Sequence, residues 1–130
     1  MTPTVVVGPV SRGSLLGALT AAALGVGFVE IRKNIGQATD SDRWIRRTTG
    51  PDYQDRHVVF GFRHGLIKSG DRVLMVDDWA DTGATALVAR ALVQDSGAHW
   101  IGAACVVDGL GNAHLRHDLP LRSLIDVRRL

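Results

Sequence analysis

The chain has 130 residues, of which 45% are apolar and 22% charged, as expected for one globular domain over residues 1–130. Its 15 basic and 13 acidic side chains leave a net charge of +2, too small an excess to indicate a nucleic-acid partner. No apolar stretch approaches the roughly 18 residues of a membrane span, so we expect no membrane partner and a cytoplasmic location.

The N-terminal residues predict a strand followed by a helix. Residues 4–9, TVVVGP, form a short apolar run ended by Gly-Pro, which is typical of a buried strand in a parallel sheet. Residues 11–25 then carry apolar side chains at helical spacing. Either Ser11 or Ser14 suits the N-cap of this helix, and Gly25 suits its C-terminal end.

The next region loses this regularity. Residues 28–31, FVEI, predict a second strand, whereas residues 34–57 are polar, rich in turn formers and without a clear period. A loop of this length is uncommon in a compact domain unless it is functional or disordered, so we expect a flexible loop over residues 34–57. A short strand, VVFGF, follows at residues 58–62.

The second half of the chain alternates strands with a helix. Residues 72–78, RVLMVDD, form the clearest strand pattern, and residues 85–97 have the 3.6-residue period of a helix that ends at Gly97. Two further strands are expected at residues 100–107 and 123–129. The alternation predicts an α/β fold, with an open, mainly parallel five-stranded sheet flanked by helices.

Two adjacent acids, Asp77 and Asp78, stand where the strand at residues 72–78 ends. Ligands of open α/β sheets bind at the carboxyl ends of the strands, so we expect these carboxylates in a ligand site. The residues that follow, ADTGAT, place Gly83 and threonine hydroxyls beside the first amides of the next helix, which suits a phosphate. Carboxylates accept hydrogen bonds from vicinal sugar hydroxyls, so the two parts together describe a site for a ribose 5-phosphate.

Three segments carry a resemblance to a known family. VLMVDDWADTGAT, at residues 73–85, closely resembles the 5-phosphoribosyl 1-pyrophosphate (PRPP) binding motif of type I phosphoribosyltransferases. GPVSRGSLLGALTAAALGVGFVEIRK, at residues 8–33, is similar to the part of adenine phosphoribosyltransferases that carries the pyrophosphate loop and a strand ending in Arg-Lys. IKSGDRVLMVDD, at residues 67–78, is similar to their approach to the acid pair, so the segments follow the family's order.

This resemblance implies a role for individual residues. Asp77 and Asp78 would bind the ribose hydroxyls and take part in catalysis. Two further groups would hold PRPP, one around its 5-phosphate and the other around its pyrophosphate: Asp81, Thr82, Gly83, Ala84 and Thr85, and then Ser11, Arg12, Gly13, Arg32 and Lys33.

The reaction implied by the resemblance is displacement of pyrophosphate from C1 of the ribose by a nitrogen of a purine nucleobase, with adenine favoured. Mg²⁺ would be bound mainly through PRPP and water, with no direct protein ligand, because this ion dehydrates reluctantly. The five histidines show no spacing typical of metal ligands. The resemblance also implies a homodimer.

Two features depart from the family pattern. The adenine enzymes carry a Glu in their mobile loop, and here residues 51–57, PDYQDRH, offer Gln54 or Asp55, of which Asp55 is the candidate catalytic base. The chain also begins at the first core strand, which predicts that the hood over the base is reduced or missing. The base pocket would then come from residues 108–110 and the C-terminal segment, or from a partner subunit.

Other interpretations fit parts of this sequence. The missing Glu and short N-terminus would suit a non-catalytic PRPP-binding sensor or regulator, or an N-terminally truncated enzyme. DTGAT also resembles the Asp-Thr-Gly turn of retroviral-type aspartic proteases, but that fold is all β and residues 82–93 have a helical pattern. Cys105, the single cysteine, has apolar neighbours and is expected to be a buried, inert thiol.

Overall fold

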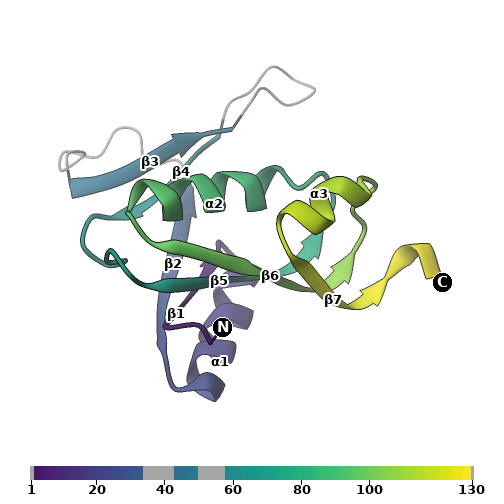
Figure 1. The fold of residues 1–130 in the computed structure, drawn as a ribbon, viewed down its shortest axis with the longest axis horizontal. Helices are drawn as coiled ribbons and strands as arrows, with labels where there is room; N and C mark the ends of the chain where they lie inside the picture. Colours follow the sequence, from purple (N-terminus) through teal and green to yellow (C-terminus); the bar gives the residue numbers. More distant parts are fainter. Residues whose placement is uncertain (1, 34–42, 50–57, 130) are drawn as a thin grey trace.

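The described part of the chain folds into one sheet with helices on both faces (Figure 1). The computed structural model describes residues 2–33, 43–49 and 58–129. The strands are β1 (Val5–Pro9), β2 (Gly27–Lys33), β3 (Trp44–Thr48), β4 (Val59–Arg63), β5 (Arg72–Ala80), β6 (His99–Asp108) and β7 (Leu121–Asp126). The helices are α1 (Arg12–Leu24), α2 (Ala84–Asp95) and α3 (Ala113–Asp118), and a 3-10 turn, η2, spans Val127–Arg129.

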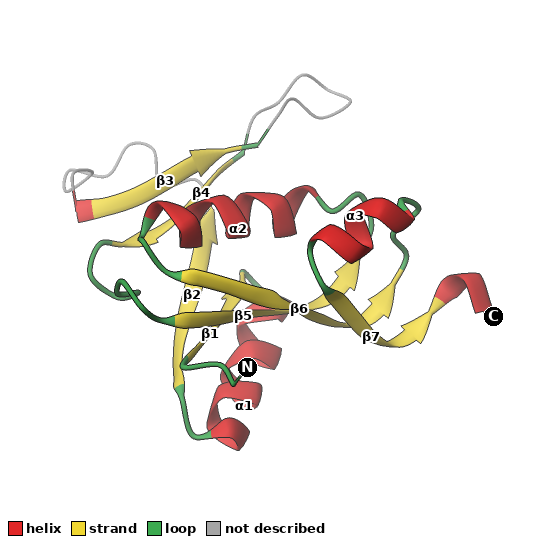
Figure 2. Cartoon of the chain, viewed as in Figure 1, coloured by secondary structure: helices red, strands yellow, loops and turns green. Residues whose placement is uncertain are grey.

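The strand order among these residues is β3-β4-β2-β1-β5-β6-β7. Strands β2, β1, β5, β6 and β7 run parallel, which confirms the mainly parallel α/β fold. Strand β4 pairs antiparallel with β2, and β3 pairs antiparallel with β4 (Figure 2). The parallel part therefore has five strands, and the antiparallel pair extends the described sheet to seven.

Strand β3 lies inside the segment 34–57, where we expected a flexible loop. Its residues pair with β4 along the full length of both strands. Arg47 also anchors β3 to α2, because its guanidinium donates two hydrogen bonds of 2.7 and 2.8 Å to the Asp95 carboxylate. The strand is thus stabilised by partners distant in sequence, which the polar local pattern does not reveal. Residues 34–42 and 50–57 of this segment lie outside the described residues.

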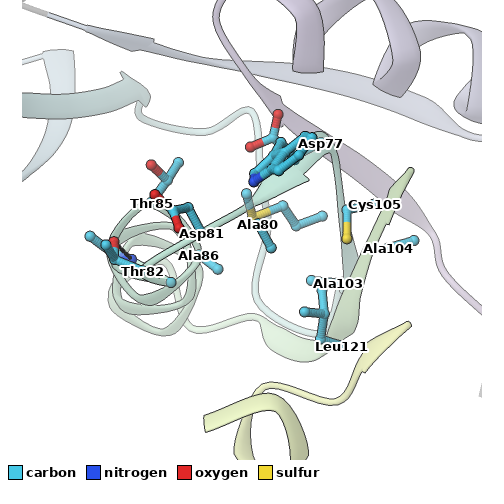
Figure 3. A pocket seen from close by; sticks show the side chains of 14 residues that line it. Asp77, Ala80, Asp81, Thr82, Thr85, Ala86, Ala103, Ala104, Cys105 and Leu121 are labelled. Atoms are coloured by element: carbon cyan, nitrogen blue, oxygen red, sulfur yellow. Dashed lines mark hydrogen bonds between the residues drawn. The ribbon is translucent and has the colours of Figure 1, made fainter. Parts of the chain in front are cut away.

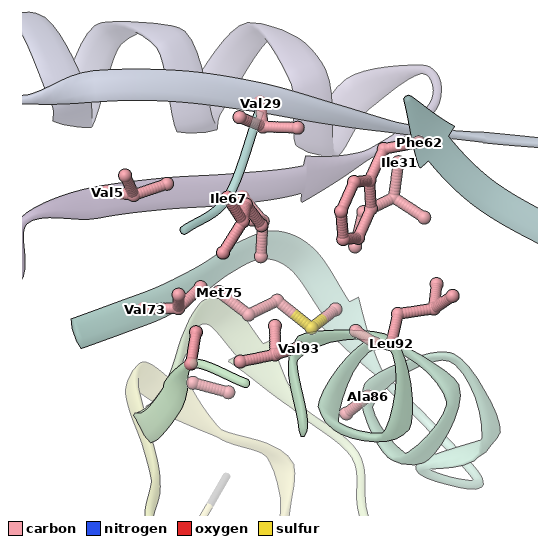
Figure 4. Packing of buried hydrophobic residues seen from close by; sticks show 14 of the residues in the cluster. Val5, Val29, Ile31, Phe62, Ile67, Val73, Met75, Ala86, Leu92 and Val93 are labelled. Carbon is pink, nitrogen blue, oxygen red and sulfur yellow. The ribbon is translucent and has the colours of Figure 1, made fainter. Parts of the chain in front are cut away.

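The side chains of β1 alternate between two apolar layers. Val5 and Val7 belong to the main cluster, which α2 covers, whereas Val6 packs into a smaller cluster beneath α1. In the main cluster, Leu92 of α2 lies close to Met75 of β5 (Figure 4). Because both faces of the central sheet are covered, its strands read as continuous apolar runs.

The two longer helices end at the glycines that the sequence indicates. Gly25 and Gly97 follow α1 and α2 with φ angles of 71° and 79°, a left-handed conformation that glycine adopts without strain. Helix α1 begins after Ser11 rather than Ser14, although the Ser11 hydroxyl forms no capping hydrogen bond. Within the described residues, none of the helices has the length and apolar character needed to cross a membrane.

Candidate functional site

The acid pair lies near the carboxyl end of β5, as expected. The Asp78 backbone N–H donates a 2.8 Å hydrogen bond to Oδ1 of Asp77, so the two carboxylates share one corner of the sheet edge. Nε of Arg12, at the start of α1, lies 2.9 Å from Oδ2 of Asp78. The Arg12 side chain is otherwise 83% exposed, which leaves its guanidinium accessible to a ligand.

A polar hollow joins the N-terminus of α1 to the acid pair. It has a volume of about 270 Å³. The pairing of β1 with β5 creates it, because these parallel neighbours end at the same edge and deliver the loop after β1 beside Asp77 and Asp78. The hollow is lined by Pro9, Val10, Ser11, Arg12, Gly13, Lys33, Asp77, Asp78 and Thr85.

Gly13 fits this corner because no side chain could. A Cβ at this position would lie 2.9 Å from Oδ1 of Asp77 and 2.6 Å from Cδ of Pro9. The loop of α1 therefore packs directly on the acid pair, with backbone where another residue would place a side chain. Gly13 thus allows this close packing, and it also lines the hollow in which a ligand is expected.

The turn after β5, residues 81–85, leads into α2. Gly83 caps the helix with a φ of 85°, and the Thr82 hydroxyl accepts a 3.2 Å hydrogen bond from the Ala84 N–H. A second hollow of about 130 Å³ lies between this turn and β6 (Figure 3). Amides at the start of a helix carry no intrahelical partner and face positive dipole density, so this turn can bind an anion.

The carboxylates and cations of the site differ in their electrostatic environment. Burial raises the pKa of the Asp77 carboxyl to about 6, and repulsion from Asp78 adds to the rise, while the Asp78 N–H and Arg12 oppose it. A proton on this carboxyl is therefore held to a higher pH than on an ordinary aspartate. Arg12 and Lys33 supply positive charge to the same hollow.

The structure separates one of the expected residues, Arg32, from this group. Arg32 precedes Lys33 on β2, so its side chain leaves the opposite face of the strand, where its Nε lies 3.7 Å from Oε1 of Glu30. Arg32 does not line the polar hollow. Asp55, the candidate base, lies outside the described residues.

The end of β6 and the residues after it were expected to contribute to the base pocket. Asp108 and Leu110 are each only 2% exposed, and the Asp108 carboxylate is paired with Arg116. Both side chains are therefore buried, and the role of residues 108–110 at a base stays a prediction. Trp79, which the sequence analysis did not single out, is 52% exposed and lines the smaller hollow beside Asp77. The sequence signal for this residue was a large aromatic side chain directly after the acid pair.

Cys105 also lines the smaller hollow, but its thiol is poorly reactive. The residue is only 7% exposed, and burial raises the pKa of the thiol to about 11, with the Asp108 and Asp77 carboxylates contributing. The expected burial of this cysteine is confirmed, and its low reactivity stays a prediction that agrees with the raised pKa, since the thiolate is the nucleophilic form.

Comparison with known proteins identifies the family. The family model described as "Phosphoribosyl transferase domain" matches residues 1–125. An adenine phosphoribosyltransferase of Paracidovorax citrulli is 38% identical over 129 residues, which are 95% of this chain and 67% of that protein. One of Nitrosospira multiformis is 39% identical over 108 residues, covering 79% of this chain and 56% of that protein. The chain thus belongs to the phosphoribosyltransferase domain family, and it spans between about half and two thirds of these relatives.

Solved structures show the same fold. The adenine phosphoribosyltransferase of Saccharomyces cerevisiae, complexed with an imino-altritol bisphosphate and adenine, superposes with a TM-score of 0.81 at 32% identity, over 95% of this chain and 68% of that chain. The Trypanosoma brucei enzyme, in complex with AMP, pyrophosphate and ribose-5-phosphate, gives a TM-score of 0.83 at 27% identity, over 100% of this chain and 59% of that chain. The α/β architecture is therefore that of the type I phosphoribosyltransferases.

The raised pKa of Asp77 predicts a pH dependence of stability. Between about pH 4.5 and pH 6 the folded state keeps the Asp77 proton that the unfolded state has already lost, so the fold loses stability as pH rises, and this loss levels off above about pH 6. The Asp77→Asn variant cannot ionise there. Its free energy of unfolding should therefore rise relative to wild type from about pH 4.5 to about pH 6 and then stay level, as measured by urea denaturation.

Asp95→Asn is the matched control for this prediction. Hydrogen bonding from Arg47 lowers the pKa of Asp95, so this carboxyl stays ionised in the folded state throughout the same range. The difference between Asp95→Asn and wild type should be nearly constant with pH. A constant difference for Asp77→Asn as well would contradict the raised pKa.

Proposed function

We propose that this chain transfers the 5-phosphoribosyl group of PRPP to a purine base, adenine, and releases pyrophosphate. The observation that carries this proposal is the polar hollow, which the acid pair, the Arg12 loop and Thr85 of the turn at residues 81–85 line together. The relatives described above are named for this activity on adenine. The Trypanosoma brucei complex holds both products of such a reaction, AMP and pyrophosphate.

The proposed binding mode follows from the chemistry of the two sides of the site. Asp77 and Asp78 accept hydrogen bonds from the ribose 2- and 3-hydroxyls, since carboxylates are strong acceptors that repel phosphate. The 5-phosphate lies in the turn at residues 81–85, where unpaired amides and the threonine hydroxyls donate to its oxygens. Together these contacts fix C1 of the ribose at the mouth of the hollow.

The leaving pyrophosphate lies against the loop at residues 11–13. Arg12 and Lys33 flank the hollow there and are placed to neutralise charge that develops as the C1–O bond breaks. The purine nitrogen forms the new bond to C1, and the ribose passes through an oxocarbenium-like state. We retain Asp55 as the candidate acceptor for the proton that the base loses. Arg32 takes no part in this proposal.

The site suits a magnesium ion that arrives with the substrate. Among the described residues, no group of three or more His, Cys, Asp or Glu side chains is placed to hold a metal. Mg²⁺ would be bound mainly through substrate phosphates and water, without a direct protein ligand, because this ion dehydrates reluctantly. When bound, the ion would supply further neutralisation of the pyrophosphate charge.

The proposal extends to location and assembly. A cytoplasmic location agrees with the single reduced cysteine. A homodimer agrees with the apolar side chains that α1 presents to solvent, since Leu15 and Leu19 are 65% and 61% exposed.

Exchanging the acid pair tests the transferase. The variants Asp77→Asn and Asp78→Asn should lower kcat/KM for PRPP roughly 100-fold or more, because each removes a charged contact that the transition state needs. The measurement is pyrophosphate release from Mg-PRPP with adenine, guanine, hypoxanthine, xanthine or uracil in turn, and we expect release with adenine. Asp95→Asn, an acid on the far end of α2, is the control and should stay within about twofold of wild type. Activity unchanged in either site variant, or release with none of the bases, would contradict the proposal.

Trp79 is the proposed platform for the base. It is half-exposed beside the acid pair, so its ring can stack on a purine attached to C1. The Trp79→Ala variant should raise KM for adenine about tenfold, the size expected from loss of one base–aromatic stack. Trp79→Phe keeps an aromatic face and should restore most of the affinity. Equal KM values in steady-state kinetics for wild type and Trp79→Ala would show that the base lies elsewhere.

A further inference from the structure

A buried ion pair closes the segment between β6 and α3. Nε of Arg116 lies 2.5 Å from Oδ2 of Asp108, and its Nη2 lies 3.2 Å from Oδ1. The side chains are 16% and 3% exposed, respectively. Asp108 also accepts a 2.8 Å hydrogen bond from the Leu110 N–H, and Arg116 donates to the Leu110 carbonyl. These four contacts, which we call the Asp108–Arg116 latch, fix the loop at residues 109–112.

The latched loop packs directly on the phosphate turn. The Gly109 N–H donates a 2.7 Å hydrogen bond to the Ala80 carbonyl, which immediately precedes the turn. A Cβ on Gly83 would lie 2.6 Å from Cδ2 of Leu115 and 3.3 Å from Cδ1 of Leu110, so these leucines press against the backbone of the turn. Leu110 is almost completely buried in this position. The latch is therefore connected to the turn through backbone and close apolar contacts.

The turn has few constraints of its own. Gly83, the N-cap of α2, has no side chain to form a capping hydrogen bond. Its φ is 85°, and a glycine can also adopt several other backbone conformations without strain. The bond from the Ala84 N–H to the Thr82 hydroxyl is 3.2 Å long and exposed. Phosphate binding needs several amides aimed at one point, and a misplacement near 1 Å can cost about 100-fold in activity. The latched loop and Leu115, which pack on the turn, are thus placed to set its geometry.

We propose that Arg116, paired with Asp108, is a positioning residue that holds the phosphate turn in its binding conformation. Neither residue lines the polar hollow or the smaller hollow, so the latch acts through Gly109, Leu110 and Leu115 and touches no substrate. This inference rests on the proposed function, because the turn is the 5-phosphate site only in that proposal.

A second ion pair, between α2 and α3, offers a control. Arg90 of α2 lies 3.0 Å from Asp118 of α3, but these side chains are 23% and 51% exposed. Asp118 is the last residue of α3, three residues before β7 begins at Leu121, so this pair lies at the end of α3 away from the turn. The variants Asp108→Asn and Asp118→Asn therefore make the same chemical change on either side of α3.

The first measurement is amide hydrogen exchange in the free protein. Two reporters are the Gly109 N–H, bonded to Ala80, and the Leu87 N–H, bonded to the Gly83 carbonyl at 2.9 Å. Asp108→Asn should speed exchange at both amides about tenfold or more, while Asp118→Asn leaves them near wild type. Arg116→Lys, which keeps the charge but not the two-pronged geometry, is the second variant and should give an intermediate result.

The second measurement is steady-state kinetics with Mg-PRPP and adenine on the folded variants. Asp108→Asn should raise KM for PRPP about tenfold, the usual effect of losing an outer partner of a binding group. Its kcat should change little, because the 5-phosphate is bound alike in ground state and transition state. Arg116→Lys should restore part of the affinity.

The outcomes separate this inference from the function it rests on. Unchanged exchange at both reporter amides in Asp108→Asn, or a KM equal to that of Asp118→Asn, would overturn the positioning role. Lower thermal stability with unchanged KM would likewise reduce the latch to a structural ion pair. Wild-type protein that fails to bind Mg-PRPP would contradict the proposed function, while the exchange data would still decide whether the latch holds the turn.

Discussion

The parallel pairing of β1 with β5 is the constraint on which the rest of the site depends. Parallel neighbours end at the same edge of a sheet, so the start of α1 and the start of α2 are delivered side by side with the acids of β5 between them. Two cations, Arg12 and Lys33, then line one hollow together with two carboxylates and with residues from the starts of both helices. This arrangement gives separate environments for phosphate and for a sugar diol within the span of a single ligand.

The close packing at this edge has an electrostatic consequence. Gly13 brings backbone against Asp77, which removes water from that carboxyl and raises its pKa to about 6. Asp78, paired with Arg12, has a partner that Asp77 lacks. The two adjacent acids are therefore chemically distinct, although they are identical in sequence. A substrate hydroxyl that donates to Asp77 would replace solvent lost in folding.

The parts of the fold that follow from local patterns could be predicted, and those that depend on distant partners could not. The strand before the acid pair and the glycines that end α1 and α2 carry strong local signals. Strand β3 has none, because its stability comes from β4 and from the bond between Arg47 and Asp95. Arg32 and Lys33 are adjacent and equally basic in the sequence, and only the structure shows that Lys33 lines the hollow whereas Arg32 lies beside Glu30.

The turn at residues 81–85 could be predicted from the sequence, but the segment that packs on it could not. Its own residues form a recognisable motif in the sequence, whereas its outer wall does not. Asp108 and Arg116 are eight positions apart, and only the turn of the chain into α3 brings them together. Trp79 follows the acids in the sequence, but only the structure shows that its side chain is half-exposed and therefore available to a ligand.

The central claim is that one edge of the sheet binds a ribose 5-phosphate and its pyrophosphate together. Isothermal titration of PRPP with Mg²⁺ into the wild-type chain tests it most directly, with ribose 5-phosphate and pyrophosphate titrated separately for comparison. We predict a single site per chain that binds PRPP more tightly than either half, and that each half competes with PRPP. Absence of binding by folded protein, or binding of PRPP with which ribose 5-phosphate does not compete, would contradict the assignment of residues 77–85.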